Sequence, residues 1–243
     1  MKYSILLSLL LSLNFCTSAQ PEVKTIINDS NAEKRTVESF TGIKVKSAIS
    51  VYLSQGNEDA VAISSSDRSD NKKIKTEVKN GTLNIYLDNG FWNGWNWKEK
   101  NIKVYVSIRT IQLLDVSGAS TIKITDPILS KNLRIEASGA STIKGEIKAT
   151  NIKLNLSGAS NINIKGIAGD AVIEASGASS LKSYDFVCES AKIEASGASS
   201  ISISVIKEIN AEASGASSIN YKGTAAIIKS NSSGASSIKK KND

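Results

Sequence analysis

The amino-acid sequence predicts an all-β protein, specifically a single-stranded, right-handed parallel β-helix, and three observations support this. The tetrapeptide Ser-Gly-Ala-Ser occurs seven times in the second half of the chain, at spacings of 18 to 21 residues. Between the copies, apolar and polar residues alternate, and no stretch has the period of an amphipathic helix. A motif that returns at a nearly fixed interval indicates a chain that coils once per repeat and stacks its coils. We therefore expect a solenoid with coils of about 19 residues.

The tetrapeptides are expected to form the corners of the coils. They begin at Ser117, Ser138, Ser157, Ser176, Ser196, Ser214 and Ser233. Glycine supplies the positive φ that a sharp turn needs, and serine can bond to nearby backbone groups. Alanine is small enough to face inward. The motif is therefore first of all a turn.

Strands are expected on both sides of each corner, because apolar residues occupy every second position there. The column five residues after the first serine contains only isoleucine and leucine: Ile122, Ile143, Ile162, Leu181, Ile201, Ile219 and Ile238. Burying one such side chain contributes about 1.5–3 kcal/mol. This column is the predicted centre of the core.

Two polar columns are expected on the outside. Two residues before the first serine stand Asp115, Glu136, Asn155, Glu174, Glu194, Glu212 and Asn231. Six residues after it stand Lys123, Lys144, Asn163, Lys182, Ser202, Asn220 and Lys239. Like charges on neighbouring strands, about 4.8 Å apart, repel one another, and the Asn and Ser residues dilute that repulsion.

The chain before the repeats is expected to be β-structure as well. Apolar alternation begins at Phe40, and Asn80-Gly81 between two apolar runs is a strong hairpin signal. Residues Asp67–Lys73 form a polar connection with room for one helical turn. We assign 20–39 to a polar tether and 40–243 to one β-helix domain, in which 117–243 contains the regular repeats.

An export signal is predicted at residues 1–19. The apolar run Ile5–Phe15 is followed by Thr17-Ser18-Ala19, which favours cleavage ahead of Gln20. A lipid anchor at Cys16 is the less favoured alternative, because bulky Phe15 stands where a small residue is preferred. The protein is expected in the periplasm, on the outer-membrane surface or outside the cell. No later run approaches the roughly 20 apolar residues of a membrane-spanning helix.

Composition excludes several kinds of chemistry. The chain has no histidine, which removes Ser-His and Cys-His nucleophiles and histidine metal sites. After signal cleavage Cys188 is the only cysteine, so no intrachain disulfide can form, and we expect it in the core. We expect no cofactor, no metal and no catalytic residues. The formal charge of +7 is spread along the chain, which favours weak attraction to anionic glycans over nucleic acid.

The candidate ligand-binding residues are Phe91, Trp92, Asn93, Trp95, Asn96 and Trp97, in a segment that contains all three tryptophans. Aromatic rings can stack on sugar faces while Asn amides bond to the hydroxyls. The alternative is that the segment folds back and buries its rings over the hydrophobic strands, as large aromatic residues usually do.

The chain resembles a known family. Phe40-x-x-Ile43-x-Val45, Gln55-Gly56, Asn80-Gly81-Thr82-Leu83 and Val116 followed by the Ser-Gly-Ala-Ser repeats are similar to the auto-transporter adhesin "head GIN" family, formerly a domain of unknown function. The resemblance covers about 40–238 and departs from the expected pattern by lacking a proline near Ser107-Ile108. It implies an exported protein of Bacteroidetes-type bacteria, similar in structure to single-stranded β-helices such as pectin lyases, with no identified active site.

Together these features favour a non-catalytic cell-envelope or surface module that acts as an adhesin or binds glycans, its partner being a cell-surface glycan or another envelope component. A polysaccharide lyase or hydrolase is the first alternative. It would use Glu136, Glu174, Glu194 and Glu212 with Arg134 and Lys192, although strand stacking alone produces such a file. A purely structural or water-ordering solenoid is the second. Self-association through the exposed edge of the last coil is a further alternative. We expect Lys239-Lys240-Lys241 to block strand pairing at that edge.

Overall fold

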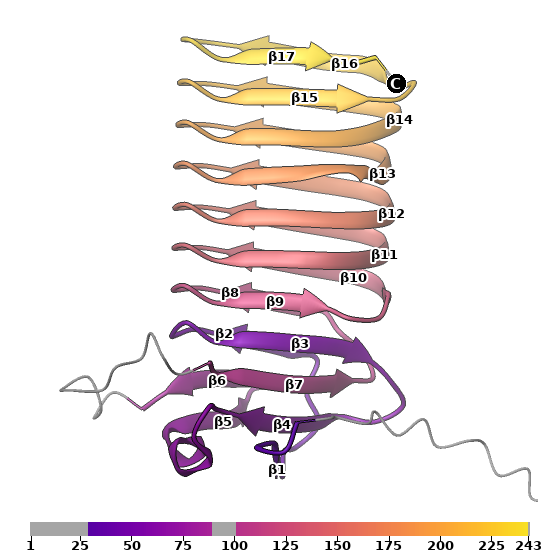
Figure 1. Ribbon diagram of the computed structural model, residues 1–243. Coiled ribbons are helices and arrows are strands. Elements are labelled where there is room, and N and C mark those ends of the chain that lie inside the picture. The colour runs from indigo at the N-terminus through magenta and orange to yellow at the C-terminus, as the bar shows by residue number, and fades with distance from the viewer. Residues whose placement is uncertain (1–28, 89–100, 243) are drawn as a thin grey trace, which may run out of the picture.

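The computed structural model describes residues 29–88 and 101–242, which form a tall stack of flattened β-coils (Figure 1). Two sheets run the length of the stack. We call the one nearer the viewer in Figure 1 the front sheet and the other the back sheet. The all-β solenoid expected from the sequence is confirmed, with parallel coils about 19 residues apart.

The repeat region contains ten strands that pair in parallel from coil to coil. They are β8 (Leu113–Val116), β9 (Thr121–Ile124), β10 (Ile128–Ala137), β11 (Thr142–Leu156), β12 (Asn161–Ala175), β13 (Ser180–Ala195), β14 (Ser200–Ala213), β15 (Ser218–Lys222), β16 (Ala226–Ser232) and β17 (Ser237–Lys240). The start of β11 pairs with β9 and its end pairs with β10. A long strand therefore bends in its middle and contributes to both sheets.

The predicted isoleucine column forms the core. Its members from Ile122 to Ile219 are fully buried, and Ile238 in the last coil is partly buried. The last coil is open: every residue of β16 is exposed, and Ile228 is 63 % exposed. Cys188 is also fully buried, as expected.

The Ser-Gly-Ala-Ser corners form a regular ladder along one edge of the stack. Their glycines have φ values between 65° and 71°. A Cβ added to Gly177 would lie only 2.8 Å from the carbonyl oxygen of Gly158 in the preceding coil. The amide of Ala178 donates to that same oxygen at 2.8 Å. Glycine is therefore required both for its φ and for the close stacking of the corners.

One detail of the predicted corner is wrong. The alanine faces solvent, and the second serine faces inward: Ala178 is exposed and Ser179 is buried. The hydroxyls of Ser141, Ser160 and Ser179 are buried without a hydrogen-bond partner among the described residues. In the last three coils, the second serine donates to the carbonyl that ends the corresponding strand of the preceding coil. The hydroxyl of Ser217, for example, donates to the carbonyl oxygen of Ala195 at 3.0 Å.

The first coil in the sequence is not the first coil in the stack. It comprises β2 (Gly42–Val45) and β3 (Ser50–Gln55), and the coil beneath it comprises β6 (Thr82–Leu87) and β7 (Lys103–Ile108). β2 pairs in parallel with both β6 and β8, and β3 pairs with both β7 and β9. The coil of 42–55 thus lies between two coils that follow it in the sequence, which the repeat pattern did not predict.

Antiparallel strands cover the bottom of the stack in Figure 1. β4 (Ala60–Ser64) pairs with β7 and with β1 (Glu33–Arg35), and β5 (Ile74–Lys79) pairs with β6. Part of the expected tether therefore adds a strand to this end. The helical turn expected at 67–73 is the 3-10 helix η1 (Arg68–Lys73), capped by Asp67.

The predicted hairpin at Asn80-Gly81 is present, with φ values of 50° and 70° that suit a tight turn between antiparallel strands. The signal and the Cys16 alternative lie outside the described residues and stay predictions, as does the handedness of the coil. Within 29–88 and 101–242, the chain has no helix that is long and apolar enough to cross a membrane.

Candidate functional site

The aromatic segment from Phe91 to Trp97 lies outside the described residues, so its role stays a prediction. Its place in the chain is nevertheless informative. It joins the end of β6 to the start of β7, the same connection that Ser-Gly-Ala-Ser makes between β8 and β9. In the sequence, the tryptophan-containing segment therefore stands where the repeats have Ser-Gly-Ala-Ser.

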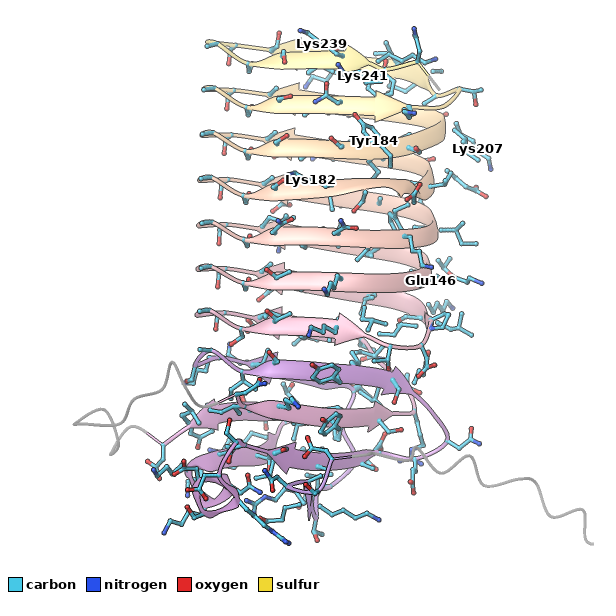
Figure 2. All side chains as sticks on the ribbon, in the orientation of Figure 1. Glu146, Lys182, Tyr184, Lys207, Lys239 and Lys241 are labelled. Carbon is cyan, nitrogen blue, oxygen red and sulfur yellow. The ribbon has the colours of Figure 1, made fainter. Side chains whose placement is uncertain are left out.

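The outer surface of the front sheet in the repeats is flat and carries two parallel files of side chains, which we call the lysine face. The first file contains only hydroxyl and amide residues: Thr121, Thr142, Asn161, Ser180, Ser200, Ser218 and Ser237. The second is the predicted basic column: Lys123, Lys144, Asn163, Lys182, Ser202, Asn220 and Lys239. Neither file contains an acid. Figure 2 shows Lys182 and Lys239 on this surface.

None of the four lysines of this face has a carboxylate partner among the described residues. Lys144, Lys182 and Lys239 are exposed and take part in none of the ion pairs of this part of the chain. The fourth, Lys123, donates from Nζ to the Tyr52 hydroxyl at 3.1 Å and lies 4.8 Å from the centre of that ring. The face therefore presents uncompensated positive charge among neutral hydrogen-bonding groups.

A tyrosine pair continues the lysine file towards the N-terminal coils. Tyr52 pairs in register with both Lys123 and Tyr105, and the two rings stack with their centres 5.3 Å apart. The Tyr105 hydroxyl donates to Asp29 Oδ2 at 2.8 Å. Burial and this hydrogen bond raise the pKa of Tyr105 to about 12. Tyr105 therefore stays neutral at physiological pH, and the tyrosine pair ends the file of lysines.

The back sheet has the opposite electrostatic arrangement. The predicted acidic column lies on its outer surface, and almost every acid there has a basic partner from a column four residues before the first serine. Glu174 accepts from Lys153 at 2.7 Å, and Glu212 accepts from Lys229 at 2.6 Å. The other pairs are Asp115 with Lys44, Glu136 with Arg134, and Glu194 with Lys192.

Sequence reasoning missed this second basic column, although the same alignment of repeats contains it as Arg134, Lys153, Lys192 and Lys229. Its effect is to neutralise the back sheet. The hydrogen bond and charge of Lys229 lower the pKa of Glu212, and those of Glu194 raise the pKa of Lys192. Both shifts favour the charged forms, whereas a general acid would need a raised carboxyl pKa.

A shallow groove of about 650 Å³ runs beside the corners on this side, lined by the acidic column and by the first serines of the repeats. The acids proposed for a lyase lie along it in separate coils. Among the described residues, no three acids or cysteines converge as metal ligands would. Cys188 is not a nucleophile either, since burial raises the pKa of its thiol to about 12. The groove is best described as a ladder of solvated ion pairs.

The fold and these surfaces define an elongated β-solenoid whose faces are built by repetition rather than by one convergent pocket. The chain belongs to the family described as "Putative auto-transporter adhesin, head GIN domain", whose model matches residues 39–225. The resemblance seen in the sequence is thereby confirmed. No curated protein matches the chain.

Solved structures share this fold at low sequence identity. A "putative adhesin" from Bacteroides fragilis NCTC 9343 is 18 % identical, with a TM-score of 0.77, over 86 % of this chain and 95 % of the other. A "putative lipid binding protein" from Parabacteroides distasonis ATCC 8503 is 20 % identical, with a TM-score of 0.63, over 87 % and 97 %. A "putative adhesin" from Parabacteroides merdae ATCC 43184 is 15 % identical, with a TM-score of 0.67, over 86 % and 95 %.

Proposed function

We propose that this protein is a non-catalytic module of the cell envelope or cell surface that binds anionic glycans through the lysine face. The observation that carries the proposal is the difference between the two sheets. On the back sheet, each basic residue of the acid-lined surface has an acidic partner. On the front sheet, Lys144, Lys182 and Lys239 have none among the described residues.

Physical chemistry favours an anionic, hydroxyl-rich ligand for such a surface. Unpaired ammonium groups attract carboxylates and sulfates, and the attraction weakens as salt screens it over about 10 Å at 0.1 M. Ser, Thr and Asn side chains both donate and accept hydrogen bonds, as sugar hydroxyls do. An adhesin family and an exported chain agree with a partner outside the cytoplasm.

The test is binding of the purified protein to an array of neutral and anionic polysaccharides at low and at physiological ionic strength. We expect binding to the anionic polymers, weaker at higher salt. Replacing Lys144, Lys182 and Lys239 together by Gln should weaken binding about ten-fold or more, if each contact contributes roughly 0.5–1 kcal/mol.

The matched control replaces Lys153, Lys192 and Lys229 by Gln, which changes the net charge equally on the back sheet. Equal losses in both triple variants would mean that only total charge matters and would contradict the proposal. A third variant, with Trp92, Trp95 and Trp97 changed to Ala, asks whether the aromatic segment adds to binding. Binding to anionic lipid vesicles but to no glycan would assign the lysine face to a membrane surface instead.

A further inference from the structure

We propose that the ligand of the lysine face is a linear acidic polysaccharide that lies along the solenoid axis, across the strands, with successive coils contacting successive sugar residues. The inference rests on the proposed function and specifies the shape and orientation of the ligand. It follows from the placement of charge within the two files.

Lys144, Lys182 and Lys239 are aligned along the solenoid axis, because they occupy one column in different coils. Register pairing places Lys144 beside Asn163 and Lys182 beside Ser202, and carries the same column to Asn220 and Lys239. Adjacent coils are separated by about 4.8 Å. Lys182 therefore lies about 10 Å from Lys144, and Lys239 lies about 14 Å further on. Along a strand, the file nearer the corner offers no cation, whereas on the other side Lys222 and Lys241 stand two residues beyond Asn220 and Lys239.

These distances exclude a compact ligand. One carboxylate, sulfate or phosphate group cannot contact more than one of Lys144, Lys182 and Lys239, because these are two and three coils apart. The nearer neighbour of Lys144 in the column, Lys123, already donates to the Tyr52 hydroxyl. A ligand that uses all three must extend across the five steps from Lys144 to Lys239, roughly 24 Å. A polymer laid along one strand would meet only one of them.

The positions between the lysines suit the neutral parts of such a polymer. Asn163, Ser202 and Asn220 occupy the same column, and the parallel file has a hydroxyl or amide residue in every coil, although the Ser180 hydroxyl is buried. A sugar residue in an extended 1,4-linked chain is about as long as the strand spacing, so each coil can contact one residue. Lysine coils would bind the acid groups, and Ser or Asn coils would bind hydroxyls. No bulky side chain in either file blocks the path.

The experiment is a length series of oligogalacturonates, from the dimer to the long polymer, with affinity measured by titration calorimetry on the full protein. Affinity should rise steeply with each added sugar until the chain spans the three lysines, at about six residues, and only slowly beyond that. Lys239→Gln should weaken binding of the long chain and leave the dimer unaffected, because the dimer can use another lysine.

A gain-of-function pair sharpens the test. Asn163→Lys adds a cation inside the column, between Lys144 and Lys182, and should tighten long-chain binding about three-fold. Val172→Lys adds the same charge to the outer surface of the back sheet and should change it little. Circular dichroism would show that both variants retain the fold.

The outcomes separate the two proposals. If affinity does not depend on chain length while the lysine substitutions still weaken binding, the lysine face binds glycans but the axial arrangement is wrong. If Val172→Lys tightens binding as much as Asn163→Lys, the axial arrangement is also wrong. If neither oligomer nor polymer binds, both proposals fail.

Discussion

Replacing a corner glycine by alanine should destabilise the solenoid mainly because the corners stack so closely. Gly177→Ala is the test and Gly81→Ala is its control. The two glycines have nearly the same φ, 67° and 70°, but a Cβ at Gly81 would meet nothing within 4 Å. A Cβ at Gly177 would meet the carbonyl oxygen of Gly158 at 2.8 Å. Comparing Gly177→Ala with Gly81→Ala therefore separates the cost of a left-handed backbone from the cost of close stacking.

The expected magnitudes follow from these two terms. A left-handed backbone costs a residue with a Cβ about 1–2 kcal/mol, offset by about 0.4–1 kcal/mol from the stiffer unfolded chain. Gly81→Ala should thus cost about 1 kcal/mol. At Gly177 the Cβ also has to be accommodated against a backbone that holds the Ala178 hydrogen bond. Overpacking of this kind costs about 1–3 kcal/mol more.

The assay is urea unfolding followed by circular dichroism, with hydrogen exchange at the corner amides to locate the defect. Gly177→Ala should lower the free energy of unfolding by about 2–4 kcal/mol and should increase exchange at Ala178 and Ala198, whose amides bond the stacked glycines. If Gly177→Ala costs no more than Gly81→Ala, close stacking of the corners is not what requires glycine there.

Three further predictions concern the core and the N-terminal coils. Ile162→Asp should lower the free energy of unfolding by about 4 kcal/mol or more and abolish the cooperative melt, because it buries an unpaired charge in the central column. A melt like that of the wild type would contradict the stacking register. Cys188 should resist thiol reagents in the native protein and react at once in urea, since its thiol is buried with a pKa of about 12; rapid native labelling would show that the core opens there. Asp59→Asn should destabilise the protein at pH 7, and the difference from the wild type should shrink as the pH falls below 3.8. Burial alone would raise the pKa of Asp59, but the hydrogen bonds and charge of Arg109 lower it. The carboxylate therefore stabilises the fold fully above its pKa in the unfolded chain, and this stabilisation is lost as the pH falls through its pKa in the folded protein. A difference that does not change with pH would rule out this role of the carboxylate.

Most of the regular architecture could be predicted from the sequence, because the residues that determine it recur in every coil. The isoleucine column and the corner glycines each repeat seven times, so periodicity alone locates them. The orientation of Ala178 and Ser179 could not be predicted in this way, since either residue is small enough to face inward. In the last three coils the inward serine bonds to a carbonyl of the preceding coil, a contact that residue size does not indicate.

The candidate site could be predicted only in part. The column of Lys144, Lys182 and Lys239 was visible in the sequence, but its importance depends on which lysines have partners. Some partners lie in another coil: Lys153 bonds to Glu174, one coil further on and two positions along the strand. Others lie in the same strand, as Lys192 and Glu194 do. Aligning the repeats identifies the charged columns of both sheets, but it does not show which lysines have an acidic partner in the folded protein.

The position of the 42–55 coil also affects how the protein folds. In the repeats, a residue contacts a partner about 19 residues away, as Ile164 does with Ser183. β2 and β3 instead contact β8 and β9 over about 72 residues, as Thr125 does with Leu53. Closing the longer loop costs about 1 kcal/mol more in chain entropy, and it must wait until residues beyond 120 are free to fold. Long-range pairing of this kind is slow. During synthesis or export, the first coil to emerge therefore gains its second neighbour only when residues up to 124 are available, and its placement joins three coils at once.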